Sequence, residues 1–447
     1  MNRWHHLLLS ATTFALAAEA AIAQAPASNA KTASVQGPRF EVDMLWPKPM
    51  PNRWILGSAT GVAVDSRDHI YVLNIPDYFT ARTEIGSGTN PPTGDCCTPT
   101  PPVVEYDASG ALVGSWGGPG EGYTWPTQAA RIGIDPAGNV WIGGAGGNDT
   151  RILKFTKDGK YLGEMGKLVA SAPAPVQAAA PDTAYQGVSR GAAGRASGFQ
   201  TPNAAAGRGG RGGRGGRGGG PPPLPANNAS LETFGGAMGF SFDAATNEAF
   251  VADGSRNHRV AVVDINTGAI KRVFGAYGNK PEDAAAPAYS PSSPASKQFG
   301  VVSCAQLAKD GQLYVCDRTN NRIQVFKKDG SFVKEKTVAP NTLGQGSVWD
   351  IAFSRDPQQK YLYVADGQNM KIWIVDRASL DVVAAFGDGG RQPGQFYAVN
   401  AIATDSKGNI YTGETLEGKR VQKFTYKGIG SVPANAGVVW PRAGAKQ

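Results

Sequence analysis

The chain has few of the residues that most often carry metal or acid–base chemistry. Its 447 residues include four histidines and four cysteines. Two of the histidines, His5 and His6, stand beside an apolar N-terminal segment, which leaves His69 and His258 for the rest of the chain. The sequence contains no HExxH stretch, in which two histidines bind the zinc ion of one class of metalloprotease. Two separated histidines do not form a three-histidine centre.

The chain also lacks an apolar run that reaches the roughly 20 residues needed to cross a membrane. Residues 7–18 form a shorter apolar run, preceded by a basic residue and followed by Ala21-Ile22-Ala23, which has the small-x-small pattern of a cleavage site. This order is typical of a secretory signal peptide. We therefore expect residues 1–23 to be a signal peptide and residues 24–37 a flexible N-terminus. The mature protein is expected to be exported, to the periplasm or the extracellular space.

Acidic residues are almost missing from residues 167–230, which hold seven basic residues and one acid, Asp182. Most of the formal net charge of +8 therefore belongs to this segment. The run GRGGRGGRGGRGGG at 207–220 resembles RNA-binding tracts, but an exported protein seldom meets RNA. Its few large apolar side chains cannot offset the entropy of ordering. We expect a long disordered insert that contacts anionic surfaces and binds no specific nucleic acid.

Six related segments occupy most of the remaining sequence. They begin at Gly61, Arg131, Gly239, Cys304, Asp350 and Ala401. Each reads as strand, tight turn, strand, loop and strand, with alternating apolar residues bounded by Asp, Gly, Asn or Ser. Five copies continue into a fourth strand: ALVGSWG, KYLGEMG, AIKRVFG, SFVKEKT and DVVAAFG. Four short antiparallel strands repeated six times predict an all-β fold, a six-bladed β-propeller.

The sixth copy offers only three convincing strands, ending at VQKFTYK. The segment RFEVDMLWP, at residues 39–47, can supply the missing strand. A ring left open would expose the unpaired backbone groups of a strand edge, and closure removes that edge. We therefore predict a propeller over residues 38–430, with its last blade completed by the N-terminal strand, and a C-terminal tail over 431–447.

The four cysteines invite pairing if the protein is exported. A three-residue turn at 309–311 would place Cys304 directly opposite Cys316. These two residues form either a cross-strand disulfide or a pair of buried free thiols. Cys96 and Cys97 are adjacent in a loop of the first copy. They form either a vicinal bridge or a metal-sensitive dithiol, since two thiols are too few for a structural zinc site.

The mouth of the central channel is the candidate binding site. The residues at the starts of the inner strands would line it, with two neighbours: Thr60, Ala130, Met238, Ser303, Trp349 and Asn400, then Ser255 and Tyr397. Aromatic and neutral polar groups suit a small amphiphile, a peptide or a glycan. The alternative is that these side chains merely fill the axis, because small propellers pack their channels. The predicted function is binding or scaffolding, with a small molecule, peptide, glycan or protein as partner.

Three stretches carry a family resemblance: VADGSRNHRVAVVD, VCDRTNNRIQVF and GQFYAVNAIATDSKGNIYTGETLEGKRVQKF. They resemble NHL-repeat propellers, and are most similar to the propeller proteins grouped with peptidyl-α-hydroxyglycine α-amidating lyase. The resemblance implies a six-bladed NHL propeller over most of the chain. It also implies a zinc lyase that uses three histidines, a tyrosine and an arginine.

The positions that match this lyase site hold other residues. The three histidine places hold Met238, Ser303 and Asn400, the tyrosine place holds Ser255, and the arginine place holds Asn74 or Ile75. Such side chains cannot bind zinc or activate a substrate hydroxyl. We therefore expect the scaffold without the chemistry, with no catalytic residue and no zinc. A divergent amidating-lyase-like, metal-dependent enzyme is the alternative.

Three aspartates, Asp253, Asp317 and Asp366, recur at matching places in the third, fourth and fifth copies. Carboxylates that converge on the axis could hold a structural calcium ion, which prefers oxygen ligands. Repetition across copies instead favours a role in hydrogen bonds inside each blade.

Overall fold

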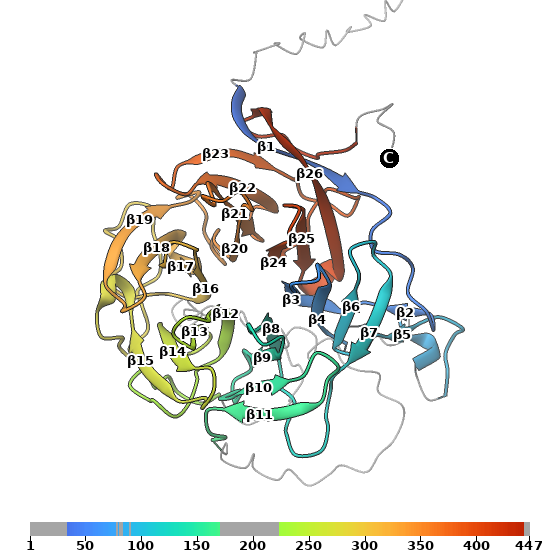
Figure 1. Ribbon diagram of the computed structural model, residues 1–447, viewed down its shortest axis with the longest axis horizontal. Coiled ribbons are helices and arrows are strands. Elements are labelled where there is room, and N and C mark those ends of the chain that lie inside the picture. Colours follow the sequence, from blue (N-terminus) through green and yellow to red (C-terminus); the bar gives the residue numbers. More distant parts are fainter. Residues whose placement is uncertain (1–33, 77–78, 80–83, 89–90, 170–222, 442–447) are drawn as a thin grey trace, which may run out of the picture. The chain divides into compact units, whose positions relative to one another are not determined.

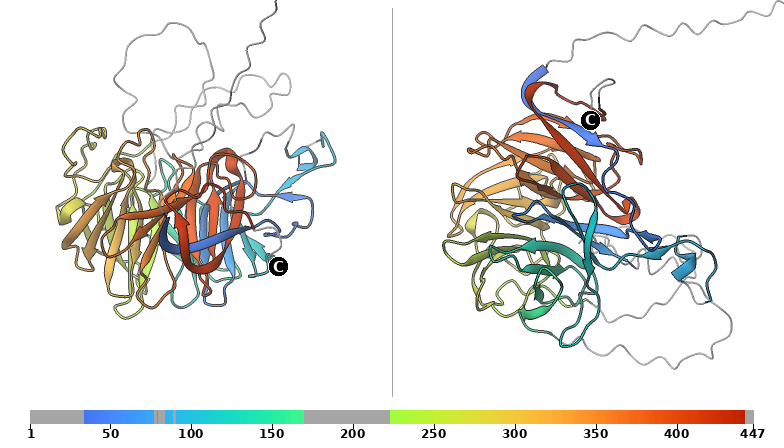
Figure 2. Two further views of the ribbon diagram at one scale, coloured as in Figure 1. Left: turned by 90° about the horizontal axis from the view of Figure 1, so that it is seen from above. Right: turned by 45° about the vertical axis from the view of Figure 1, so that its right-hand side comes forward.

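The computed structural model describes residues 34–76, 79, 84–88, 91–169 and 223–441, and their regular structure is almost entirely β. Six four-stranded antiparallel sheets follow one another around an axis (Figure 1). The predicted six-bladed β-propeller is confirmed. The innermost strand of each sheet is the first strand of its copy, and the strands run between the two faces of the ring (Figure 2).

The strands of the first three blades lie close to the predicted segments. Blade 1 contains β3 (Ser58–Val64), β4 (Ile70–Ile75), β6 (Val103–Tyr106) and β7 (Leu112–Trp116). Blade 2 contains β8 (Ala129–Ile134), β9 (Val140–Gly144), β10 (Ile152–Phe155) and β11 (Tyr161–Met165). Blade 3 contains β12 (Ala237–Asp243), β13 (Glu248–Asp253), β14 (Arg259–Asp264) and β15 (Ile270–Phe274).

The other three blades repeat the pattern. Blade 4 contains β16 (Val302–Leu307), β17 (Gln312–Asp317), β18 (Arg322–Lys327) and β19 (Phe332–Thr337). Blade 5 contains β20 (Asp350–Phe353), β21 (Tyr361–Asp366), β22 (Lys371–Asp376) and β23 (Val382–Phe386). Blade 6 contains β24 (Val399–Thr404), β25 (Ile410–Glu414), β26 (Arg420–Pro433) and β1 (Ser34–Asp43). A two-stranded parallel pair, β2 (Trp54–Ile55) and β5 (Thr98–Pro99), lies outside the blades.

The N-terminal strand closes the ring as predicted, because β1 is the outer strand of blade 6 and pairs antiparallel with β26. Phe40 and Val42 are buried there in a cluster shared by blades 5 and 6. The pairing continues beyond the predicted limits, with residues 34–37 opposite residues 430–433. The predicted flexible N-terminus therefore ends too late. Ser34, Val35 and Gln36 are exposed, so the apolar pattern gave no sign of a strand that backbone pairing stabilises.

The end of the predicted disordered insert is also ordered. Residues 223–230 are described, and Asn228 is buried. Its side chain donates to the carbonyl of Glu282 at 2.9 Å and to Asp283 at 3.0 Å. The prediction of disorder over 167–230 is therefore too long, because polar contacts can order a segment that lacks apolar side chains. The arginine–glycine run and the predicted signal peptide lie outside the described residues.

The two faces of the ring differ in what they carry. Because neighbouring strands are antiparallel, the turns between first and second strands (such as 65–69, 135–139 and 405–409) lie on one face, here called the hairpin face. The segments between second and third strands (such as 254–258, 318–321 and 415–419) lie on the opposite face, here called the loop face. Among the described residues, no helix has the length and apolar character needed to cross a membrane.

Candidate functional site

The axis of the propeller is filled by one arginine. Arg131, near the start of β8, has a side chain that is 6% exposed. Its guanidinium donates to backbone carbonyls of four other blades: Met238 at 2.7 Å, Thr60 and Asn400 at 3.0 Å, and Trp349 at 3.3 Å. It also lies 3.7 Å from the carboxylate of Asp350. The positive charge is therefore held by a ring of oxygen atoms at the centre of the molecule.

Asp350 is the counter-charge at the axis. Burial raises the pKa of its carboxyl, and Arg131 opposes that shift. The backbone N–H groups of Ile351 and Ile402 donate to it at 3.0 and 3.1 Å. Each oxygen of the Asp350 carboxylate therefore accepts a hydrogen bond. Asp350 and Arg131 form a buried ion pair whose polar groups have hydrogen-bond partners.

The structure places most of the predicted channel-mouth residues inside the protein. Thr60, Met238, Ser303, Trp349 and Asn400 are all buried. Three of their side chains donate to backbone carbonyls: Thr60 to Ala129, Ser303 to Val348, and Asn400 to Thr60. Their burial favours the alternative that the sequence left open, in which these side chains pack inside the protein. Ser255 and Tyr397 are half-buried.

The sequence contained a signal for the axial pair that the analysis of repeats missed. The first residues of the six aligned copies are Gly61, Arg131, Gly239, Cys304, Asp350 and Ala401. Four are small, and the other two are an arginine and an aspartate. A side chain on Gly61 would press against the backbone of Ile132 at 2.9 Å. One large cation and its counter-ion in a column of small residues therefore fit together at the axis.

A second feature joins blades 3, 4 and 6 to the segments that arrive from the blades before them. In blade 4, Asp317 pairs with Arg322 at 2.8 Å and accepts the N–H of Gly300, also at 2.8 Å. Arg322 in turn donates to the carbonyl of Gln298. Blade 3 uses Asp253, Arg259 and Gly235, and blade 6 uses Glu414, Arg420 and Tyr397 in the same way. We call these units the acid–arginine junctions.

These contacts assign the repeated aspartates a structural role. The carboxylates of Asp253 and Asp317 are each paired with an arginine of their own blade. The interpretation as hydrogen-bonding elements inside the blades matches this geometry, whereas an axial calcium site would need the carboxylates to turn toward one another. The axis instead holds the guanidinium of Arg131.

Blade 5 has the acid without the arginine. Asp366 accepts from the indole Nε1 of Trp373 at 2.8 Å and from the side chain of Asn369 at 2.6 Å. Lys371 stands where the other blades have arginine, and its ammonium lies over the Trp373 ring, 5.2 Å from the centroid. Burial raises the pKa of Asp366 to about 6, against the opposing effect of these hydrogen bonds.

A cavity with a volume of about 480 Å³ lies between blades 6 and 1. Its apolar wall comes from the segment that joins β1 to β3, from the loop after β4, and from the ends of β6 and β26: Pro47, Met50, Trp54, Ile55, Leu56, Phe79, Tyr106 and Val421. Its charged lining comprises Glu84, Arg391, Lys419 and Arg420. We call it the closure pocket, because it lies where the ring closes.

The charged groups of the closure pocket are held in place. The Lys419 ammonium lies 2.7 Å from Glu84 and 4.9 Å from the centre of the Phe79 ring. Arg420 pairs with buried Glu414. The guanidinium of exposed Arg391 lies 4.8 Å from the centre of the Tyr397 ring and donates to the carbonyl of Glu417. Tyr397, predicted from the sequence as a binding residue, thus lies beside this pocket.

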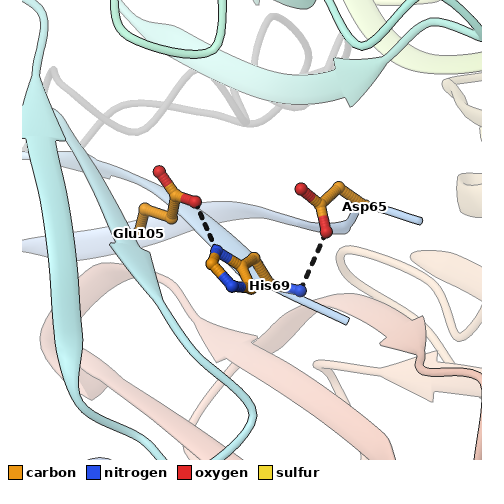
Figure 3. A group of neighbouring side chains, drawn as sticks. All are labelled: Asp65, His69 and Glu105. Carbon is orange, nitrogen blue, oxygen red and sulfur yellow. Dashed lines mark hydrogen bonds and ion pairs between the residues drawn. The ribbon is translucent and has the colours of Figure 1, made fainter. Parts of the chain in front are cut away.

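One group of side chains on the hairpin face has the composition of a metal site. Asp65, His69 and Glu105 each offer a ligand atom, and these atoms all lie within 4.8 Å of one another. Figure 3 shows the imidazole turned toward Glu105, with Asp65 on the other side of the ring. Nδ1 of His69 lies 2.6 Å from Oε1 of Glu105. Sequence reasoning treated His69 as a lone surface histidine, because its partner on the third strand is distant in sequence.

The register of β16 and β17 places Cys304 and Cys316 opposite each other, as the sequence predicts. The two form a disulfide. Cys96 and Cys97 form a second disulfide. Neither pair lines the closure pocket or belongs to the group around His69.

Comparisons with known proteins identify one repeat family and several similar solved structures. A model of the NHL repeat matches residues 305–326, which run from β16 to β18. A catalytically inactive virginiamycin B lyase from Staphylococcus aureus, solved with quinupristin, is similar at 13% identity and a TM-score of 0.42 over 89% of each chain. A protein of unknown function from Bacteroides thetaiotaomicron is 13% identical, with a TM-score of 0.42 over 83% of this chain and 70% of that one. A streptogramin B lyase is 9% identical, with a TM-score of 0.43 over 87% and 98%. No curated protein sequence matches the chain.

Proposed function

We propose that this chain, a six-bladed β-propeller of the NHL type, is an exported binding protein whose ligand site is the closure pocket. The observation that carries the proposal is a cavity of about 480 Å³ that combines an aromatic and aliphatic wall with fixed charges. Its volume is within the range of roughly 300–1,000 Å³ that is usual for small-molecule sites. Export rests on the signal-peptide pattern of residues 1–23.

The contacts of Arg131 argue against a ligand on the axis of the propeller. A ligand there would have to displace Arg131 from four backbone carbonyls and from Asp350. Those carbonyls and the carboxylate would then be buried without their donor, at a cost of roughly 1–3 kcal/mol for each group. The sequence suggested a ligand at the channel mouth, and we instead propose that the ligand binds in the closure pocket.

The chemistry of the closure pocket favours an amphipathic anion. Trp54, Ile55 and Phe79 offer apolar surface for the body of a ligand. Lys419 is neutralised by Glu84, and Arg420 by Glu414, so Arg391 supplies the surplus positive charge at the pocket. A planar apolar group with one carboxylate or sulfonate would stack on the wall and pair with this guanidinium. This class is the small amphiphile among the partners expected from the sequence.

The test uses 8-anilinonaphthalene-1-sulfonate, which has an aromatic body and one anionic group. Trp54→Ala should weaken its affinity at least about tenfold, because a buried aromatic anchor of this kind contributes on the order of 2 kcal/mol. Trp440→Ala is the matched control, since Trp440 is exposed and lines a different, smaller cavity of about 190 Å³. Equal losses in the two variants, measured by fluorescence titration, would contradict the proposal.

The anionic preference has its own test. Arg391→Gln should weaken the sulfonate several-fold and leave the neutral analogue N-phenyl-1-naphthylamine unchanged, because only the sulfonate interacts with the guanidinium. Lys407→Gln, at an exposed site on the hairpin face, removes the same unit of charge from the protein and should change neither affinity. A similar loss with both probes would show that Arg391 acts through the shape of the pocket and not through its charge.

A further inference from the structure

One corner of the hairpin face is built in the same way in blades 2 and 6. In blade 2, Asp135 closes the turn between the first two strands and accepts from the side chain of Asn139 at 3.0 Å and from Nε1 of Trp141 at 3.1 Å. The ammonium of Lys154, on the third strand, lies 3.1 Å from the same carboxylate. The corner of blade 2 therefore has one carboxylate, one amide and one ammonium.

Blade 6 repeats this corner. Asp405 accepts from the side chain of Asn409 at 2.7 Å and from the hydroxyl of Tyr411 at 3.0 Å. Lys423 is the residue opposite Tyr411 on the third strand, just as Lys154 is opposite Trp141 in blade 2. The amide and the lysine are thus common to the two blades.

Blade 1 keeps the aspartate and changes the other two groups. His69 stands where the other corners have Asn139 and Asn409, with the same spacing of four residues from the aspartate. Glu105 is opposite Tyr71 on the third strand, where the other corners have lysine. The amide has become an imidazole and the ammonium a carboxylate, so these two groups and the retained Asp65 make three side chains that can bind a metal.

We propose that Asp65, His69 and Glu105 bind one divalent transition-metal ion of the zinc class. One imidazole nitrogen and two carboxylates form a mixed nitrogen–oxygen donor set that suits Zn²⁺ and its neighbours better than Ca²⁺ or Mg²⁺. Nδ1 of His69 is the imidazole ligand, because it already faces Glu105 (Figure 3). The proton between these two atoms leaves to solvent when the ion enters.

The site is open enough for an ion to reach it. The side chain of His69 is 25% exposed, and those of Asp65 and Glu105 are each 11% exposed. Asp65 and His69 lie in the turn between β3 and β4, and Glu105 lies on β6. The N–H groups of Arg67 and His69 fix one oxygen of Asp65 at 2.8 and 2.9 Å, which leaves the second oxygen for the ion.

Arg67 is the group that an ion would replace. Its guanidinium lies 2.7 Å from Asp65 and 3.2 Å from Glu105. Its side chain is 45% exposed, so it can move into solvent without leaving a buried charge. The arginine then balances the two carboxylates when no ion is bound and competes with the ion for them.

The test is Zn²⁺ binding to the full chain, with His5 and His6 both changed to Gln and any affinity tag removed. The double variant His69→Asn with Glu105→Lys gives blade 1 the residues that blades 2 and 6 already carry, so it should fold and melt like the parent. It should lose Zn²⁺ affinity by at least about 100-fold, because two of three ligands are gone. Co²⁺ should give visible d–d absorption in the parent and none in the variant.

Two further variants keep the result specific. Arg67→Gln removes the competing cation and should tighten Zn²⁺ binding several-fold, an effect that loss of a merely structural ion pair would not produce. His258→Gln changes a buried imidazole whose Nδ1 contacts the carbonyl of Gly300 at 2.7 Å, and should leave the affinity unchanged. Binding only at millimolar Zn²⁺, or equal affinity in the parent and the double variant, would overturn the proposal.

Discussion

Blades 4 and 5 are neighbours with the same strand pattern, but they stabilise a buried aspartate with different partners. Both place an aspartate at the end of the second strand, fully buried. Asp317 meets Arg322, which extends to the incoming segment from blade 3. Asp366 accepts from an indole N–H, one side-chain amide and two backbone N–H groups. The first carboxylate forms an ion pair with an arginine of its own blade, and the second is held by hydrogen bonds from uncharged groups.

The difference shows that features shared by several blades and features of a single blade have different meanings. The acid–arginine junction recurs in blades 3, 4 and 6, and its contacts join each blade to the chain entering it, so recurrence marks structure. Three departures place a chemically distinct group: Asp366 without arginine in blade 5, Arg131 with Asp350 at the axis, and His69 with Glu105 at the corner of blade 1. Each departure changes the charge or the protonation of one position in the propeller. These positions are therefore the candidates for a function that the other blades do not share.

The largest expected effect comes from removing the cation in each of the two blades. Arg322→Met leaves Asp317 buried without its ion pair and should lower the free energy of unfolding by about 3–5 kcal/mol. Burial lowers the pKa of Arg322, but the attraction of Asp317 and Tyr277 outweighs it and the net shift is upward, as expected for a stabilising partner. Lys371→Met should cost no more than about 1 kcal/mol, since its contact is with a ring face.

Urea denaturation of the two variants and the parent measures this contrast. Comparable losses in Arg322→Met and Lys371→Met would show that Lys371 serves as the counter-ion of blade 5, and the distinction between the two blades would fail.

The second effect is the pH dependence that Asp366 of blade 5 should contribute to the stability of the protein. The ordinary pKa of an aspartate is 3.8, and burial raises that of Asp366 to about 6. Between these values the folded state keeps a proton that the unfolded state releases, so stability falls as the pH rises through this window. Above pH 6 the penalty is fully present, at about 3 kcal/mol.

Asp366→Asn removes the titrating group and sharpens the comparison. The stability of the parent relative to this variant should be greatest near pH 4 and should fall by up to about 3 kcal/mol by pH 7. Other groups titrate in both proteins and cancel in the difference. A difference that stays constant from pH 4 to 7 would mean that Asp366 is ionised throughout, as a paired carboxylate would be.

Much of the fold could be predicted from the sequence because its signals are local. Alternating apolar residues gave the strands, and a three-residue turn placed Cys304 opposite Cys316. The missing fourth strand of the last copy required the N-terminal strand to close the ring. These inferences need only the period of a strand and the geometry of a hairpin.

The candidate sites were harder to predict because they depend on residues that do not repeat. The closure pocket is made by the segment joining β1 to β3, the loop holding Phe79, and the turn at Gly418, and no copy supplies a template for it. The axial column was assigned to ligand binding because Arg131 was not compared with the small residues aligned with it. The group around His69 was missed because Glu105 lies on another strand.

The smallest effect concerns the segment between blades 2 and 3, where Arg259 does what Arg322 does in blade 4. Its guanidinium donates to the carbonyls of Asn228, Ser230 and Thr233, and the side chain of Asn228 accepts from the N–H of His258 at 2.7 Å. The junction therefore holds the incoming chain from about residue 228 onward. Asn228→Ala should cost about 1–3 kcal/mol, because it leaves buried polar groups without their partners.

Replacing residues 170–222 with a Gly-Ser linker of 13 residues should instead leave the protein as stable or slightly more so. A shorter loop lowers the entropy cost of closure by about 1 kcal/mol, which would raise the Tm by about 2–4 °C. Thermal melts of the linker variant, alone and combined with Asn228→Ala, separate the two contributions. If the linker variant loses as much stability as Asn228→Ala, the replaced residues contribute to packing, and the junction at Arg259 is not sufficient to anchor the incoming chain.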